Sequence, residues 1–296
     1  MALAVRRELP RIARAVDAIV KTFQRGGNLY YVGAGTSGRL AILDAAECPP
    51  TFGTPPRMVR AVVAGGSKAL QHAVEGAEDS ARDGARDLRR AGVSKRDVVV
   101  GLSASGTTPF VLGALEFAKR IGAVTVGVTS NPGTPVAKRA HIAIAPDTGP
   151  EVIAGSTRLK AGTAQKLVLN LLSTASMVRI GRVYGNWMVH VALTNQKLRR
   201  RGARILEEAT GVAPRTAERA LRQSGHNLPA ALVMLKTGAN ARDAQRWLAT
   251  ARGNVRQALE IARNAATHRR ETARTGRTLA APRRTRWGAR GRPRPR

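Results

Sequence analysis

Two segments of the chain combine glycine with hydroxyl side chains at spacings that suit phosphate binding. The first reads Gly33-Ala34-Gly35-Thr36-Ser37-Gly38, and the second reads Ser103-Ala104-Ser105-Gly106-Thr107-Thr108. Each follows a short apolar run and precedes a helix-like stretch, so it would offer a phosphate backbone N–H groups, hydroxyl groups and a helix N-terminus. A tight turn or an ordinary helix cap explains either segment alone. Two such segments at neighbouring strand ends can converge on one phosphate.

The first segment also has the Gly-x-Gly-x-x-Gly spacing of dinucleotide-binding loops. Those loops are accompanied by an acidic ribose ligand near the end of the second strand. This chain has Val62-Val63-Ala64-Gly65-Gly66 at that point. The sequence therefore argues against NAD and favours a phosphate.

These segments must be positioned by alternating strands and helices. Short β-branched runs bounded by Gly, Ser or Pro lie at 28–33, 58–64, 97–102, 124–129 and 141–145. Helix-like stretches lie at 3–23, 37–46, 67–91, 108–121 and 135–139. Because the strand runs are continuously apolar, they indicate a parallel sheet covered on both faces, that is, a doubly wound three-layer α/β/α sheet. Ligands of such sheets bind outside the carboxyl ends of the strands.

The chain becomes helical after the last strand run. We expect helix from 162 to 197 and a break at Arg199-Arg200-Arg201-Gly202. Turn-helix spacing then predicts a small domain at 203–262, similar to a ubiquitin-associated three-helix bundle. The domains are thus expected to be 1–202, 203–262 and a disordered, Arg-rich tail at 263–296.

Charge raises a nucleic-acid-binding hypothesis, since the 296 residues carry a formal net charge of +31. The tail alone holds twelve Arg against one Glu, but four Phe, three Trp and three Tyr leave few stacking platforms for single strands. One cysteine and five scattered histidines show no metal-ligand spacing, so no metal is expected. No run of residues has the length and apolarity of a membrane span or signal peptide, and we expect a cytoplasmic protein.

Longer motifs carry a specific resemblance. They are 43–53 (LDAAECPPTFG), 64–66, 74–80 (VEGAEDS), 149–166 (GPEVIAGSTRLKAGTAQK) and 183–186 (VYGN). Together with the two hydroxyl segments, they closely resemble N-acetylmuramic acid 6-phosphate etherases, which have the sugar isomerase (SIS) fold, from about residue 9 to 260. The resemblance implies phosphosugar contacts from Gly35, Thr36, Ser37, Ser103, Ser105 and Thr108. Two cations, Arg158 and Lys160, would contact substrate or else form structural ion pairs.

The resemblance also implies a reaction and two acid–base residues. The family removes D-lactate from the C3 ether of its substrate and adds water, without metal or organic cofactor. A proton leaves C2 while the ether oxygen is protonated, which requires two carboxyl groups. By the family's motifs, Glu47 corresponds to the proton donor and Glu78 to the second acid–base residue, in a homodimer. Without the resemblance, Glu47 would read as a backbone cap and Glu78 as a solvated helix charge.

The chain departs from the family pattern at several positions. It has Thr107 where members usually have Arg, His190 where they have an acidic residue, and Gln196 where they have Glu. Members also have several tens of residues before the position of Met1, which suggests that the N-terminal segment of this chain is truncated. The alternative function is a non-catalytic phosphosugar sensor of the same fold, as in glucokinase regulatory proteins. A sensor has no reason to keep both Glu47 and Glu78.

Overall fold

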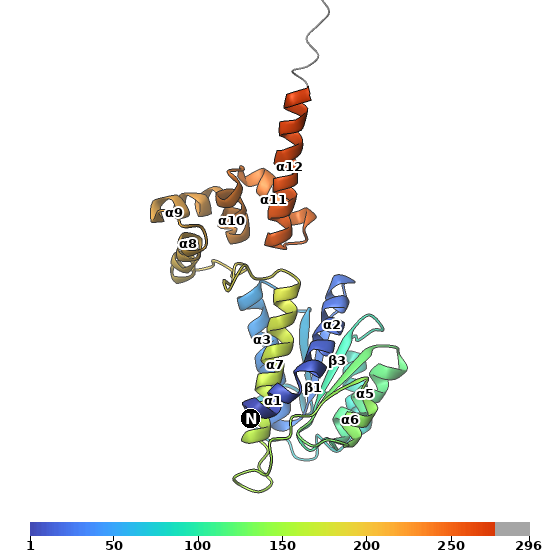
Figure 1. The fold of residues 1–296 in the computed structure, drawn as a ribbon. Coiled ribbons are helices and arrows are strands. Elements are labelled where there is room, and N and C mark those ends of the chain that lie inside the picture. The colour runs from blue at the N-terminus through green and yellow to red at the C-terminus, as the bar shows by residue number, and fades with distance from the viewer. Residues whose placement is uncertain (276–296) are drawn as a thin grey trace, which may run out of the picture.

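A five-stranded parallel sheet forms the centre of the computed structural model, which describes residues 1–275 (Figure 1). The strand order is β2-β1-β3-β4-β5, with all neighbours parallel. The strands are β1 (Leu29–Gly33), β2 (Val59–Val63), β3 (Val98–Leu102), β4 (Val124–Val128) and β5 (Ile142–Ile144). All five predicted strands and the doubly wound, three-layer architecture are confirmed.

Helices cover both faces of the sheet, which explains why the strands are apolar on both sides. One face carries α1 (Ala2–Arg7), α2 (Leu9–Gln24), α3 (Gly35–Phe52) and α7 (Lys160–Arg179), and the other carries α4 (Ala81–Arg90), α5 (Pro109–Arg120) and α6 (Pro135–Arg139). Successive side chains of β1 pack into the cores on opposite faces of the sheet. Leu29 and Tyr31 pack with α2, α3 and α7, whereas Tyr30 and Val32 pack with α4 and α5.

The predicted helix at 67–91 is wrong in its first half. A 3₁₀ turn, η1 (Gly66–Leu70), is followed by turns as far as Ser80. Gly76, within the predicted helix, has a positive φ angle of 69°, which a continuous helix excludes. The Ser80 side chain then accepts a hydrogen bond from the Asp83 N–H at 3.1 Å and so caps the start of α4.

The helix predicted to end at 46 continues to Phe52. It passes through Pro49 and Pro50, and it stops where Gly53 takes the left-handed conformation and donates its N–H to the Pro49 carbonyl. Phe52 is buried in the core, so packing holds the last turn in place.

The continuous helix predicted for 162–197 also differs from the structure. The helix α7 ends at Arg179, and residues 180–195 are irregular, with Gly181 and Gly185 at φ angles of 83° and 59°. Val189 and Val191 of this segment are buried in the core of the helical region that follows. Their burial anchors the irregular segment to that core.

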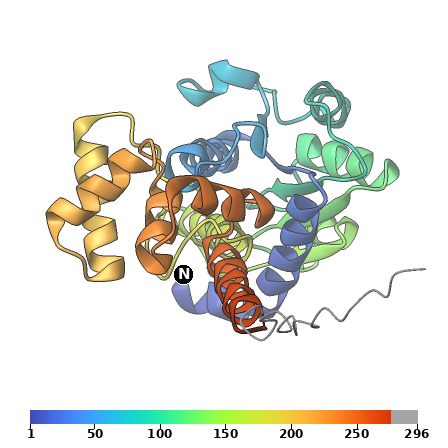
Figure 2. The same ribbon diagram turned by 90° about the horizontal axis from the view of Figure 1, so that it is seen from above.

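The helical region has five helices where sequence spacing predicted three. They are α8 (Gln196–Thr210), α9 (Pro214–Gln223), α10 (Leu228–Thr237), α11 (Ala241–Thr250) and α12 (Val255–Thr275). We call these five helices the bundle. The bundle has its own apolar core and lies beyond the C-terminal end of α7, and Figure 2 shows α8 and α9 projecting to one side of the sheet.

The predicted tail boundary at 263 falls inside α12, which continues to Thr275. The remainder of the predicted disordered tail, 276–296, lies outside the described residues. Within the described part of the chain, no helix has both the length and the apolar character needed to cross a membrane.

Candidate active site

The two hydroxyl loops lie side by side at the carboxyl edge of the sheet. They follow β1 and β3, which are neighbours with Gly33 opposite Leu102. The first loop is very tight, because a Cβ on Gly33 would collide with the Gly38 backbone N at 2.8 Å. Glycine is therefore required here by close backbone approach, and the sequence prediction that the loops are neighbours is confirmed.

The second loop gathers its hydroxyl groups around Ser103. The Ser103 Oγ lies 2.8 Å from Thr108 Oγ1 and 3.3 Å from Ser105 Oγ, and it accepts the Gly106 N–H at 3.0 Å. Gly106 has a φ angle of 74°, and a Cβ there would overlap the Thr134 side chain. The loop thus concentrates three hydroxyl groups whose hydrogens can turn toward an anion, just before α5 begins at Pro109.

The first loop holds its hydroxyl group differently. Ser37 is buried, and its Oγ donates to the Gln165 Oε1 of α7 at 2.9 Å. The buried Gln165 Nε2 has no partner among the described residues. Because a hydroxyl donates one hydrogen, Ser37 can serve a phosphate only if this bond is released. Rotation of the Gln165 amide would let its Nε2 donate to Ser37 Oγ and would free the hydroxyl hydrogen for a phosphate oxygen.

The remaining predicted contacts of the first loop lie at the start of α3. Gly35 is exposed with a φ angle of 51°, and Thr36 is half-buried. A Cβ on Gly162 of α7 would lie 3.5 Å from the Thr36 methyl group, so the N-terminal part of α7 adjoins this loop.

Glu78 lies near both loops. Its carbonyl accepts the Phe110 N–H at 3.0 Å, which fixes its backbone to the first turn of α5, directly after the second loop. The exposed Glu78 also lines a cavity of about 230 Å³ together with Gly35 of the first loop and Arg39 of α3. Glu78 therefore lies in a turn that lines the candidate site. The alternative interpretation, a solvated charge on a helix, does not describe this position.

Arg39 is a site residue that sequence reasoning missed. Its guanidinium donates to the carbonyls of Ala69, Leu70 and His72 at 3.0, 3.2 and 3.3 Å. These bonds hold the irregular segment that leads to Glu78 against α3. The only signal in the sequence is a cation in the first turn of a helix that follows a glycine loop.

Glu47 lies far from this cavity within one chain. It is exposed on α3, twelve residues after Gly35, which corresponds to about 18 Å along the helix axis. The same outer side of α3 carries Leu43, whose side chain is also exposed. One chain therefore brings together Glu78 and the two loops, but not Glu47.

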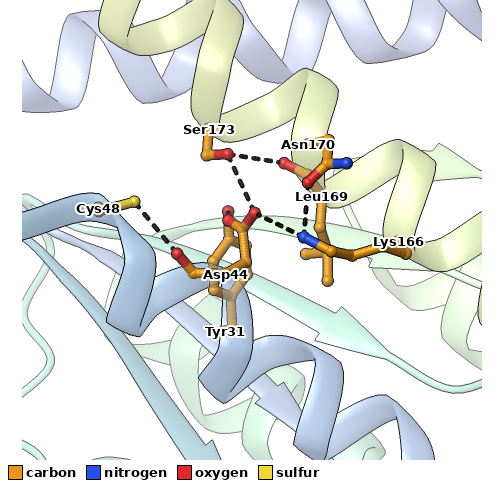
Figure 3. Close-up of polar contacts among 7 residues, drawn as sticks. All are labelled: Tyr31, Asp44, Cys48, Lys166, Leu169, Asn170 and Ser173. Carbon is orange, nitrogen blue, oxygen red and sulfur yellow. Dashed lines mark hydrogen bonds and ion pairs between the residues drawn. The ribbon is translucent and has the colours of Figure 1, made fainter. Parts of the chain in front are cut away.

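A buried polar network fastens the middle of α3 (Figure 3). Asp44 accepts hydrogen bonds from Tyr31 Oη at 2.9 Å and Ser173 Oγ at 3.1 Å, and Lys166 Nζ lies 3.9 Å away. Burial raises the pKa of Asp44, while the Tyr31 hydroxyl and the Lys166 ammonium oppose the rise. The network ties α3 to both β1 and α7.

Cys48 donates to the Asp44 carbonyl from a buried position. Burial raises the pKa of its thiol to about 12, so it remains protonated at neutral pH. A structural interpretation of this cysteine fits better than a nucleophilic one.

Among the described residues, neither predicted cation forms a hydrogen bond or salt bridge with the hydroxyl loops. Lys160 Nζ donates to the Pro150 carbonyl at 2.8 Å, and Arg158 is exposed. The Glu151 carboxylate accepts the N–H groups of Lys160 and Ala161 at 2.9 and 3.0 Å, and these bonds lower its pKa. The N-terminus of α7 is therefore occupied by a side chain, and no local sequence signal predicts this cap.

The departures from the family pattern lie in different places. Thr107 belongs to the site, where its Oγ1 donates to Ser105 Oγ at 3.0 Å. His190 lies in the segment before the bundle, with its Nε2 2.9 Å from the Gly253 carbonyl oxygen, and Gln196 is the first residue of α8.

Several known proteins are similar to this chain. The SIS domain model matches residues 76–175, and the model of the glucokinase regulatory protein N-terminal SIS domain matches residues 11–119. An N-acetylmuramic acid 6-phosphate etherase of Geobacillus thermodenitrificans is 54% identical over 258 residues, which are 87% of this chain and 88% of the relative. One from Pasteurella multocida is 52% identical over 258 residues, 87% of this chain and 86% of the relative. A phosphoheptose isomerase structure from Francisella tularensis covers 57% of this chain and 86% of its own at 19% identity, with a TM-score of 0.45.

Proposed function

The chain belongs to the N-acetylmuramic acid 6-phosphate etherase family, and we propose from this premise how its own residues divide the work of a carbon–oxygen lyase. The reaction breaks the C2–H and C3–O bonds of the open-chain substrate, releases D-lactate and leaves a C2=C3 double bond. Water then adds its oxygen at C3 and a proton at C2, which gives N-acetylglucosamine 6-phosphate. The observation that carries the assignment of roles is the position of Glu78, which shares a cavity with the first hydroxyl loop and is bonded through its backbone to the helix that follows the second.

The 6-phosphate is held by the two loops in this proposal. Ser103, Ser105 and Thr108 donate from the second loop, and Gly35, Thr36 and Ser37 contribute from the first. A site of this kind resembles other anion sites, in which backbone N–H groups and hydroxyls at helix N-termini surround a phosphate. Neutral hydrogen-bond donors are sufficient in such a site, because the phosphate itself carries the negative charge.

Glu78 is the base that removes the C2 proton. It is exposed at the cavity and its backbone is anchored, so a carboxylate can reach a sugar whose phosphate lies in the loops. Arg39 positions the Glu78 segment through its three bonds to backbone carbonyls. Its cation lines the same cavity and suits the carboxylate of the departing lactyl group.

Glu47 is the proton donor to the lactyl oxygen, and we place it in the site of a second subunit. The reacting C2 and C3 atoms are bonded neighbours, and each catalytic carboxyl group must come within about 3 Å of the atom that it serves. A separation of about 18 Å along α3 is too large for one chain. Leu43, one helical turn from Glu47, is exposed and gives this side of α3 an apolar side chain that suits a homodimer interface.

The test combines lactate release with a mixed dimer. Wild-type protein incubated with N-acetylmuramic acid 6-phosphate should release D-lactate, and Glu78→Gln and Glu47→Gln should each lose about 10²- to 10⁴-fold in rate. Differently tagged chains allow a heterodimer with one Glu47→Gln and one Glu78→Gln subunit to be purified. If Glu47 acts across the interface, one of its two sites is intact and about half the wild-type rate returns.

Other outcomes separate the parts of the proposal. A heterodimer as inactive as its parents places Glu47 in its own chain's site, while a monomer in sedimentation removes the interface altogether. Wild-type protein that binds the substrate but releases no lactate would support the phosphosugar sensor. The sensor is not favoured, because relatives more than half identical over most of the chain are etherases.

Nucleic-acid association through the basic tail is a separate proposal. Residues 276–296 contain eight Arg and no acidic residue, and counterion release gives such segments salt-dependent polyanion binding. A chain ending at Thr275 keeps all of α12, which a cut at 262 would not. Earlier heparin elution with unchanged lactate release supports the proposal, and unchanged elution places polyanion binding on the rest of the chain. A cytoplasmic location stays a prediction, which cell fractionation tests.

A further inference from the structure

A second cavity, of about 470 Å³, lies where the bundle meets the sheet domain. Its walls come from the end of α2, the segment after α7 and the turn between α11 and α12. Met58 also lines it, and this residue precedes β2, so the cavity lies toward the amino ends of the strands. The hydroxyl loops follow the carboxyl ends. This cavity is therefore distinct from the candidate active site.

The charged lining of this cavity is entirely basic. It includes Arg179, Arg182 and Arg252, and no Asp or Glu is among the residues that line it. The polar remainder consists of side chains that hydrogen-bond without bearing charge, namely Gln24, Thr250, Asn254 and Gln257. Such a combination is complementary to an anion.

Two of the three arginines have no counter-charge. Arg179 pairs with Asp17, whereas neither Arg182 nor Arg252 forms a salt bridge in the described part of the chain. Arg182 is half-buried, and burial lowers the pKa of its guanidinium. Charged groups removed from water are normally paired with an opposite charge. Arg182 has no such partner among the described residues.

Arg252 is held in place by an unusual backbone. Its φ angle is 52°, a left-handed value that is uncommon outside glycine, and its Nη1 donates to the Gln24 carbonyl at 3.3 Å. This bond joins the turn between α11 and α12 to the end of α2. Arg252 is exposed and lines the cavity, where this bond anchors its guanidinium group.

Packing around the cavity brings the two cations close together without adding a negative charge. A Cβ on Gly253, the residue after Arg252, would lie 4.0 Å from Arg182 Nη1, and His190 Nε2 lies 2.9 Å from the Gly253 carbonyl oxygen. Burial and the nearby Arg182 lower the pKa of His190 to about 4, so it is neutral at pH 7. The positive field of Arg182 and Arg252 is left uncompensated.

We propose that this cavity is a binding site for a small phosphate monoester, held by the guanidinium groups of Arg182 and Arg252, and that its occupancy fastens the bundle to the sheet domain. Planar guanidinium groups bind phosphate oxygens through paired hydrogen bonds, which favours a phosphate over a single-atom anion. The volume falls in the range of ordinary small-molecule pockets, which typically hold about 300 to 1,000 Å³, so a phosphorylated sugar fits as well as free phosphate. The inference does not depend on etherase activity.

Titration calorimetry on the full-length protein tests the proposal, with N-acetylglucosamine 6-phosphate and inorganic phosphate as separate titrants in 150 mM chloride. We expect two binding events per chain in the wild type. The substitutions Ser37→Ala and Ser105→Ala, made together, should weaken one event, and Arg182→Gln should weaken only the other, by about tenfold or more. Tighter binding of the sugar phosphate than of inorganic phosphate identifies a phosphosugar ligand, and equal binding identifies free phosphate.

The controls separate a built site from general basicity. Arg242→Gln removes the same charge from exposed α11 outside the cavity and should keep both events. Arg252→Asn, which tolerates a left-handed backbone, should act like Arg182→Gln and replaces it if that variant does not fold. Lactate release at saturating substrate should stay near the wild-type rate in both cavity variants. Two undiminished events in Arg182→Gln and in Arg252→Asn, or a single event in the wild type, would overturn the proposal.

Discussion

Two helix pairs hold the two halves of the candidate active site, and different interactions hold each pair together. The α4–α5 pair carries Glu78 and the second hydroxyl loop, and its helices touch through glycine. A Cβ on Gly113 would overlap the Ala81 carbonyl oxygen, and a Cβ on Gly84 would overlap that of Phe110. Shape alone therefore sets the distance between these helices.

The α3–α7 pair, which carries the first loop and Glu47, is joined by buried polar side chains. Ser37 bonds to Gln165, and Asp44 bonds to Ser173 and pairs with Lys166 (Figure 3). Such contacts tolerate a small change of volume but not the loss of a partner. The stability of the α4–α5 pair should therefore depend on side-chain volume, and that of the α3–α7 pair on its polar partners and on pH.

The largest expected effect comes from adding one methyl group to the glycine contact. Gly113→Ala forces a Cβ into the Ala81 carbonyl, and we expect a loss near the upper end of ordinary overpacking, about 3 kcal/mol in the free energy of unfolding. Gly162→Ala is the matched control in α7, because its Cβ would meet only ordinary contacts at 3.5 Å or more. It should be neutral or stabilise by up to about 1 kcal/mol. Urea unfolding measures both, and equal losses would contradict the comparison.

The two loop serines should differ in what their removal costs. Ser37→Ala and Ser105→Ala should each weaken N-acetylglucosamine 6-phosphate binding by about 1.5 to 3 kcal/mol and leave the weak binding of the unphosphorylated sugar unchanged. Only Ser37→Ala should also lower the free energy of unfolding, because Gln165 Oε1 then loses its buried donor. Ser105 is exposed, so its replacement should change stability by less than about 0.5 kcal/mol. Calorimetry and urea unfolding give the two readouts, and a matching stability loss in Ser105→Ala would count against the distinction.

The second loop offers a gain-of-function test at Thr107. Family members usually have Arg at this position, so Thr107→Arg should add a cation beside Ser105 and strengthen binding of the phosphorylated sugar by up to about 1 kcal/mol. The gain should shrink as salt is added, because the new contact is solvent-exposed. Thr107→Gln controls for side-chain length without charge. An equal gain in the Gln variant would show that charge is not the cause.

The smallest expected effect is the pH response of the α3–α7 pair. Burial raises the pKa of Asp44 in the folded state above its unfolded value near 3.8. Between these two values the folded protein binds more protons than the unfolded chain, so this group's contribution to stability falls as the pH rises through the window. Asp44→Asn should remove that fall. The difference in unfolding free energy between wild type and variant, measured from pH 3.5 to 7, checks the sign.

The sequence by itself determined the sheet and the neighbourhood of the two loops. Apolar β-branched runs of about five residues, separated by helix-length segments, permit little else than a parallel sheet covered on both faces. The glycines of the first loop and the serines of the second lie directly after strands, and parallel strands place their carboxyl ends at one edge. These features are local, so they can be read without knowing distant partners.

Only the tertiary structure decided how the site residues are held and which of them meet. Ser37 takes its partner 128 residues away at Gln165, and Asp44 takes one 129 residues away at Ser173. Turns replace the helix that was predicted through Glu78. The Phe110 N–H donates to the Glu78 carbonyl, and the Arg39 guanidinium donates to carbonyls earlier in the same segment. Glu47 belongs to α3 because the helix continues beyond the predicted end at 46 to Phe52, which is buried in the core. Hydrogen-bond partners so far apart in the chain depend on the packing of whole layers, and no local propensity encodes that packing.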